Sequence, residues 1–125
     1  MAQRGWAYLF GCGPGCKVSD SFEIYQLPYC DYAERKLFPI GGDGSGNNYV
    51  LDLSLGDASP IYFSDVEGGE FKKYVVSSGF LKFIWFIVEQ HYLSDDDISW
   101  PFDREYVLKH DPGIVKCGFR LPWDV

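Results

Sequence analysis

The chain has few cations and no long apolar run. Of its 125 residues, 11 are Lys or Arg and 18 are Asp or Glu, so the formal net charge is −7. A general nucleic-acid-binding protein needs clustered cations to neutralise phosphates, and this charge argues against that class. The longest apolar run covers residues 83–88, whereas a membrane-spanning helix needs about twenty apolar residues. We therefore expect neither a nucleic-acid partner nor a membrane partner.

Cysteine is also scarce, and the N-terminal region shows no export signal. The four cysteines are Cys12, Cys16, Cys30 and Cys117. A short apolar patch over residues 6–10 is broken by the Gly-rich residues 11–15 before the hydrophobic segment of a signal peptide is complete. The expectation is a cytoplasmic protein whose cysteines are reduced thiols.

Apolar and aromatic residues are abundant. The hydrophobic share is 46% and the aromatic share 18%, which excludes a disordered chain, a coiled coil and a collagen-like repeat. A chain of 125 residues is long enough for one compact core. We expect a single domain over residues 1–125.

The centre of the chain predicts an antiparallel meander. The Gly-rich and Asn-rich residues 41–48 form a predicted hairpin loop after the short apolar segment 37–40. Strands are predicted over residues 49–53, 61–65 and 71–76, separated by turns at 56–60 and 67–70. The polar and apolar alternation of residues 21–27 predicts a further strand, ended by Pro28, and residues 6–10 resemble a short buried strand.

Helices are predicted after the meander. Apolar residues at helical spacing predict a helix over residues 79–92, with Ser77 and Ser78 as N-terminal caps, and a shorter helix over 103–110. A last strand is predicted over 114–119. The predicted fold class is α+β, a single domain with a twisted antiparallel sheet of about four to six strands and helices packed on one face.

The C-terminal region is too aromatic to be a free tail. Trp100, Phe102, Tyr106 and Trp123 lie in residues 94–125, and disordered segments are poor in aromatic residues. We expect this tail to pack on the helix 79–92, whose apolar residues extend around most of its circumference. A second copy of the chain is the other possible cover, so both a monomer and a homodimer are open.

The glycine-rich loop does not match a phosphate or calcium motif. A strand rather than a helix follows it, and no Lys or Arg lies between Lys36 and Lys72. Asp43 could begin a calcium loop, but Asn48 stands where that loop needs Gly and Ser54 where it needs Glu. A tight hairpin accounts for the loop better.

The sequence predicts no enzyme active site and no cofactor. A Cys nucleophile needs a base within reach, and nothing in the spacing selects His91 or His110 for that role. A zinc site of four ligands, with Cys12 and Cys16 completed by two of Cys30, Cys117, His91 and His110, is left open as an alternative, although only Cys12 and Cys16 have ligand-like spacing.

Acidic residues dominate the meander. No Lys or Arg lies among Asp43, Asp52, Asp57, Asp65, Glu67 and Glu70, and most of these acids fall in predicted turns. We expect one end of the sheet to be strongly negative. Both a solvated set of loops and a surface for a basic partner are consistent with this pattern.

The order of these segments resembles the SUKH superfamily, the Smi/Knr-type domain. The resemblance covers residues 37–90 and is carried by FPI at 38–40, GDGSGNNYVLDL at 42–53, PIYFSD at 60–65 and SSGFLKFI at 77–84. Residues 1–36 and 94–125 diverge from it, since the family usually begins with an amphipathic helix. The resemblance implies an α+β fold without enzymatic activity.

In bacteria such domains commonly serve as immunity proteins, so the resemblance implies binding to a cognate protein toxin, such as a nuclease, whose active site is occluded. Our candidates for charge complementarity to a basic toxin are Asp43, Asp57, Asp65, Glu67 and Glu70, with Tyr49 and Tyr62 as apolar anchors if they face outward. The alternatives are a non-enzymatic adaptor domain and a small zinc-binding module.

Overall fold

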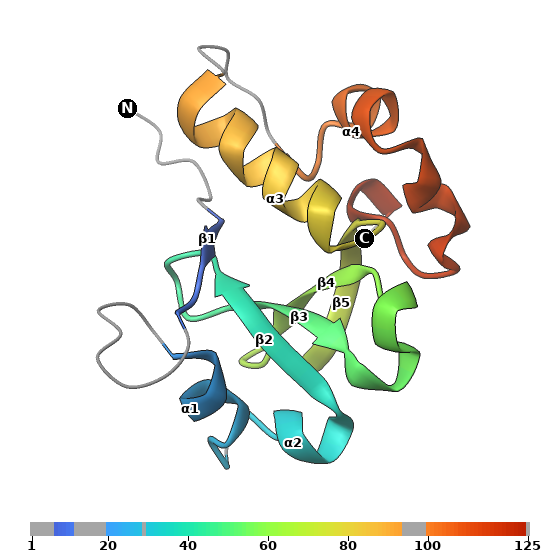
Figure 1. Cartoon of the computed structure of the whole chain (residues 1–125). Coiled ribbons are helices and arrows are strands. Elements are labelled where there is room, and N and C mark those ends of the chain that lie inside the picture. Colours follow the sequence, from blue (N-terminus) through green and yellow to red (C-terminus); the bar gives the residue numbers. More distant parts are fainter. Residues whose placement is uncertain (1–6, 12–19, 29, 94–99, 125) are drawn as a thin grey trace.

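The computed structural model describes residues 7–11, 20–28, 30–93 and 100–124. A five-stranded antiparallel sheet forms its centre, with the strands in chain order from one edge to the other (Figure 1). The strands are β1 (Tyr8–Leu9), β2 (Leu37–Gly42), β3 (Asn48–Asp52), β4 (Ile61–Asp65) and β5 (Glu70–Ser77). The predicted α+β class with an antiparallel sheet is confirmed.

The hairpin between β2 and β3 forms where the glycine-rich loop was predicted. Gly42 pairs with Asn48 across the two strands, and Asn48 pairs in turn with Ser64 of β4. Gly41 is required by a close approach of β1, because a Cβ atom there would overlap the carbonyl oxygen of Tyr8. The three predicted strands of the meander correspond to β3, β4 and β5.

Four α-helices accompany the sheet in the described residues: α1 (Ser21–Tyr25), α2 (Tyr32–Arg35), α3 (Phe80–Val88) and α4 (Arg104–His110). A π-helical turn, Glu89–Leu93, continues α3, so the predicted helix over 79–92 is confirmed in its extent. His91 in this turn donates from Nε2 to the carbonyl of Ala7 at 2.9 Å when that nitrogen carries the proton, which joins the end of α3 to the segment before β1. Short 3-10 helices cover Leu53–Ala58, Pro112–Cys117 and Pro122–Asp124.

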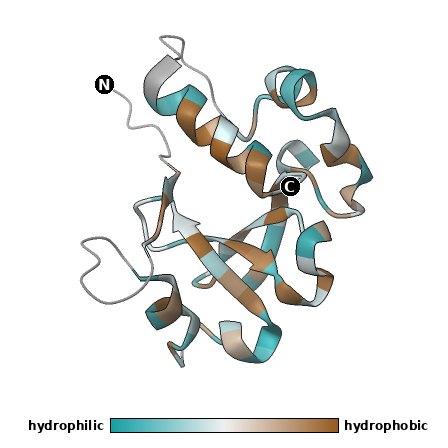
Figure 2. Ribbon diagram, viewed as in Figure 1, coloured by the Kyte–Doolittle hydropathy of each residue, from teal (hydrophilic) through white to brown (hydrophobic). Residues whose placement is uncertain are grey.

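Helix α3 crosses one face of the sheet, as Figure 1 shows. The ring of Tyr49 lies 5.1 Å from that of Phe83 and 5.9 Å from that of Trp100. Phe83 and Phe86 are fully buried. Figure 2 shows apolar residues along α3 and along the strands that it crosses. Burial of these aromatic side chains is the main stabilising contribution to this half of the core.

Helix α2 meets the sheet from the opposite face. The buried hydroxyl of Tyr32 accepts a hydrogen bond from Asn48 Nδ2 at 2.8 Å and donates to Ser64 Oγ at 3.0 Å. Asn48 and Tyr49 are neighbours on β3 and point to opposite faces, because successive side chains of a strand alternate. The sequence prediction placed the helices on one face, whereas the fold encloses the sheet between α3 and α2.

The C-terminal region packs on α3, as predicted for the part that the structure describes. The ring of Trp100 lies 5.5 Å from that of Phe86, and His110 lies 4.5 Å from Trp85. Lys82 Nζ donates to the carbonyl of His110 at 2.7 Å. Residues 94–99, which belong to the same prediction, lie outside the described residues.

The remainder of the tail follows β5 instead of α3. The backbone N–H of Val75 donates to the carbonyl of Arg120 at 2.9 Å, and Arg120 Nη2 donates to the carbonyl of Lys72 at 3.1 Å. The ring of Phe119 contacts that of Tyr62 with 5.3 Å between centroids. The tail therefore covers the outer edge of the sheet as well as the helix.

The strand predicted over residues 21–27 is wrong, because this segment forms α1. The side chain of Asp20 accepts a hydrogen bond from the backbone N–H of Phe22 at 2.8 Å and so caps the helix. Phe22 and Tyr25 are three positions apart, and both rings contact Phe38 of β2. Packing on Phe38 therefore uses helical spacing rather than the alternation seen in the sequence.

Two further predictions are wrong. The strand expected over residues 114–119 is a 3-10 helix, Pro112–Cys117, with proline in its first turn and Gly118 in a left-handed conformation at φ 70° after it. Proline has no N–H for a strand ladder, and this favours the helical turn. Helix α3 has Gly79 as its N-cap, without a side-chain cap, while the hydroxyls of Ser77 and Ser78 bond elsewhere.

Candidate functional site

Two loops lie at one end of the sheet and carry acidic side chains. The β2–β3 loop contains Asp43, and the β4–β5 turn contains Glu67 and follows Asp65. Both connections lie at the same end because β2 to β5 form a continuous antiparallel meander. We call Asp43, Asp65, Glu67 and Glu70 the acidic end of the sheet. Its charge also acts on the core, since Asp43 and Asp65 both contribute to raising the pKa of Tyr74, after the larger effect of burial.

Asp43 organises its own loop. Its carboxylate accepts hydrogen bonds from the backbone N–H of Ser45 at 2.8 Å and from Asn47 Nδ2 at 3.2 Å. Aspartate at the start of a glycine-rich turn commonly forms such local bonds. The carboxylate therefore stabilises the loop and remains partly exposed.

Asp65 is also held locally. Its carboxylate accepts from the backbone N–H of Gly68 at 2.8 Å and pairs with Lys73 Nζ at 3.3 Å. The bond from Gly68 and the nearby Lys73 ammonium lower the pKa of Asp65 despite an opposing effect of burial. Asp65 thus stays ionised well into the acidic range and brings little uncompensated charge to the surface.

Glu67 contributes the least compensated charge of this end. Its side chain is exposed, and no described residue forms an ion pair with it. Glu70 instead pairs with Arg120 Nη1 at 3.3 Å, an exposed pair of small energetic value. Glu67 also lies on the rim of a hollow of about 520 Å³ lined mostly by apolar groups: Tyr8, Phe10, Ile24, Leu27, Val66 and buried Cys30.

Four of the six acids lie at this end of the sheet, and the other two do not. Asp52 ends β3, and Asp57 lies exposed in the 3-10 helix that follows, at the opposite end of the sheet. Burial acts to raise the pKa of Asp52, but hydrogen bonds from Ser54 and the ion pair with Lys72 outweigh it and lower the pKa. A partner that contacts only one end of the sheet can therefore bind either the acidic end or Asp57, but not both.

Tyr49 and Tyr62 are core residues, so the condition that they face outward is not met. Each of these two residues is only 4% exposed. Tyr49 contacts Phe63, Phe83 and Trp100, and Tyr62 contacts Phe119. Burial raises the pKa of both phenols. Aromatic residues on half-buried strands usually face inward, and these two follow that rule.

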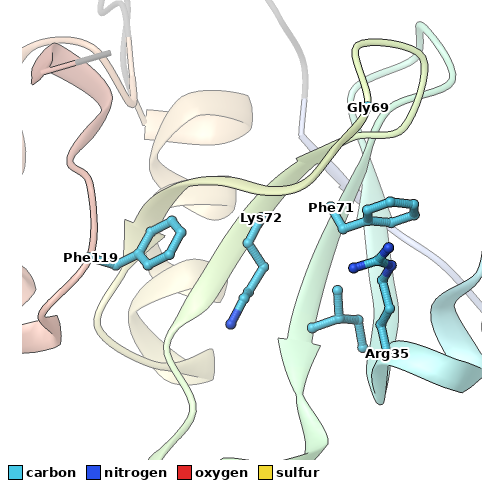
Figure 3. Close-up of a pocket in the computed structure, with 6 residues that line it drawn as sticks. Arg35, Gly69, Phe71, Lys72 and Phe119 are labelled. Carbon is cyan, nitrogen blue, oxygen red and sulfur yellow. The ribbon is translucent and has the colours of Figure 1, made fainter.

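A pocket that sequence reasoning missed lies between α2 and the C-terminal tail. It is lined by Arg35, Leu37, Gly69, Phe71, Lys72 and Phe119, and Figure 3 labels all of these except Leu37. Its volume is about 440 Å³. The guanidinium of Arg35 lies 3.8 Å from the centre of the Phe71 ring. We call these six residues the cationic pocket.

Metal binding finds no support in the described residues, where no three His, Cys, Asp or Glu side chains form a possible ligand group. Cys12 and Cys16, the pair on which the zinc hypothesis depends, lie outside the described residues. Cys30 is buried, and burial together with Asp111 raises the pKa of the Cys117 thiol. None of the described helices is long and apolar enough to cross a bilayer.

Comparisons of the chain with protein-family models, with curated proteins and with solved structures find no match. The candidate sites are therefore the acidic end of the sheet and the cationic pocket, on the geometry of their own residues.

Proposed function

We propose that the chain is an immunity-type protein that binds a basic protein toxin and occludes its active site. The observation that carries this proposal is the acidic end of the sheet. Exposed Glu67, which forms no ion pair with the described residues, and partly exposed Asp43 lie there on two adjoining loops. The resemblance of residues 37–90 to the SUKH superfamily supports the same function. Negative charge on exposed loops accelerates the encounter with a positive surface and selects against acidic partners.

The acidic end is suited to a contact because its loops are held in place before binding. Hydrogen bonds from Ser45 and Asn47 to Asp43, and from Gly68 to Asp65, fix the two turns. A pre-ordered loop loses little conformational entropy on association, so more of the contact free energy appears as affinity. Apolar groups in the adjacent hollow, among them Phe10 and Val66, would supply the buried area that charge alone does not give.

Co-expression tests the proposed function. An immunity gene is expected to follow its toxin gene directly, so the protein encoded immediately upstream is the partner to express. Cells that produce this partner should survive when the chain is present and die when it is absent. Equal killing in the presence of the folded chain would contradict the immunity function and favour the adaptor alternative.

Two matched charge reversals test the surface. Glu67→Lys changes the acidic end without removing an ion pair among the described residues, and Asp57→Lys makes the same change at the opposite end. We expect Glu67→Lys to reduce the association rate about tenfold at low salt, with little change for Asp57→Lys. Equal rates for the two variants, with an unaltered salt dependence, would remove the acidic end from the interface.

A further inference from the structure

The cationic pocket concentrates positive groups on a protein of net charge −7. Arg35 comes from the end of α2 and Lys72 from β5, and their side chains lie in one pocket (Figure 3). The aromatic rings of Phe71 and Phe119 lie in the same lining. The Arg35 guanidinium lies against the Phe71 ring, and the Lys72 ammonium lies near the Phe119 ring, so the pocket offers cationic and aromatic groups to an anion with an apolar body.

Arg35 has donors to offer. Its guanidinium stacks on Phe71 at 3.8 Å, and stacking uses the face of the group rather than its edge. The side chain is 51% exposed, and its ion pair with Asp31 is long at 4.0 Å. The guanidinium donates no hydrogen bond to the part of the chain that the structure describes. The N–H edge of Arg35 therefore remains available for the two parallel hydrogen bonds that a carboxylate accepts.

Lys72 is more strongly held but is not saturated. Its Nζ lies 3.2 Å from Asp52 Oδ2, and the side chain is 33% exposed. An ammonium group has three donors, and this pair occupies one of them. The centroids of the Tyr62 and Phe119 rings lie 5.0 and 5.6 Å from Nζ, so the ammonium lies close to two aromatic rings.

The charges around the pocket indicate a singly charged anion. Asp31 and Asp52 already neutralise Arg35 and Lys72 in part, so the pocket has no large excess of positive charge. A dianionic phosphate would meet the net negative charge of the protein without enough compensation. A carboxylate requires one charge and matches the planar fork of Arg35.

We propose that the cationic pocket binds a small carboxylate whose planar apolar body lies against Phe71 and Phe119. The carboxylate accepts hydrogen bonds from Arg35 and is attracted by Lys72. Leu37 completes the apolar lining, and the volume of about 440 Å³ falls in the range of small-molecule sites, roughly 300–1,000 Å³. This proposal does not rest on the toxin-binding function, because none of the four carboxylates that form the acidic end lines the pocket, although Gly69 of the adjoining β4–β5 turn does.

Titration with benzoate, followed by amide chemical shifts in NMR, tests the proposal. We expect saturable shifts at Arg35, Gly69, Phe71 and Lys72. Benzamide, which has the same ring and no charge, should bind at least about tenfold more weakly, since a charge-assisted hydrogen bond is lost. Shifts that do not saturate, or benzamide binding equal to that of benzoate, would overturn the proposal. Tighter binding of inorganic phosphate would overturn the assignment to carboxylates.

Variants locate the site. Arg35→Gln should weaken benzoate binding about tenfold or more, and the matched control Arg104→Gln, an exposed position on α4, should leave it unchanged. Lys72→Gln should weaken binding too, but it also leaves Asp52 without its ion pair. The half-exposed Arg35 is therefore the deciding position, with thermal unfolding as the check that the variant is folded. Benzoate affinity equal in Arg35→Gln and Arg104→Gln would overturn the site.

Discussion

The carboxylate of Asp111 binds Ser78 through two hydrogen bonds, one from the backbone N–H at 2.7 Å and one from the hydroxyl at 2.6 Å. Asp111 follows α4 and is only 1% exposed, while Ser78 lies between β5 and α3. These two bonds join the C-terminal tail to the point where the chain passes from sheet to helix. A buried carboxylate with two donors contributes more to stability than an exposed ion pair does.

Replacing this carboxylate should destabilise the protein. In Asp111→Asn one acceptor oxygen becomes an NH₂ group that faces a donor of Ser78, and we expect the free energy of unfolding to fall by about 1–3 kcal/mol. Urea denaturation of the variant and of Asp124→Asn, at an exposed position, measures the difference. Similar midpoints for the two variants would contradict the stabilising role of Asp111.

Alanine substitutions along α3 should destabilise the protein strongly at buried positions and weakly at exposed positions. Phe86 is fully buried, and Phe86→Ala should cost about 3–5 kcal/mol of unfolding free energy. Leu81 is 82% exposed, and Leu81→Ala should change stability by less than about 0.5 kcal/mol. Ile84 is half-buried, so Ile84→Ala should fall between them. Denaturation curves give this order, and a larger loss for Leu81→Ala than for Phe86→Ala would show that the helix is rotated.

Removing the tail should expose the core. Trp100, Val107 and Ile114 are buried, and truncation after Leu93 uncovers the rings of Phe83 and Phe86 that contact Trp100. We expect the truncated chain to aggregate or to unfold at a much lower temperature, because a contiguous apolar face becomes exposed to water. Light scattering and thermal unfolding measure both effects. A monomeric truncated chain that melts cooperatively near the full-length temperature would exclude the stabilising role of the tail.

Alkaline pH should destabilise the fold through Tyr74. Burial, with Asp43 and Asp65, raises the pKa of this phenol to about 12. The unfolded chain loses this proton near pH 10, so the stabilising effect is complete below about pH 10 and is lost as pH rises toward about 12. We expect Tyr74→Phe to lose less unfolding free energy over this interval than the unaltered chain, by roughly 1–2 kcal/mol. Urea denaturation at several alkaline pH values measures the two slopes, and identical slopes would contradict the prediction.

The meander and α3 were predictable because their signals are local. Glycine and asparagine at positions 41–48 mark a turn, and the flanking segments have β-branched and aromatic residues. The segment 21–27 was predicted as a strand because a helix of five residues is too short to show the helical spacing of its apolar residues. Its helical state depends on the cap at Asp20 and on the contact with Phe38, which joins distant parts of the chain.

The candidate sites also differ in how far they could be predicted, because some of their features depend on local sequence and others on contacts between distant segments. The acidic end was predicted in part, because the turns that carry Asp43 and Glu67 are visible in the sequence, but the position of Asp57 depends on which loops share an end of the sheet. The burial of Tyr49 and Tyr62 depends on Phe83 and Phe119, which follow much later. The cationic pocket brings Arg35 beside Phe71 and Phe119. No spacing in the sequence links these three positions.

The bond from Val75 to the carbonyl of Arg120 determines how a partner can approach the sheet. An exposed edge strand offers free N–H and C=O groups to which a peptide can add as a further strand. The tail occupies part of this edge at β5, and β1 at the other edge is only two residues long. Addition of a strand at β5 would therefore compete with the tail for the backbone groups of Val75 and Lys72. Recognition through side chains and loops avoids this competition, and its specificity can change by substitution at the surface while the sheet stays intact.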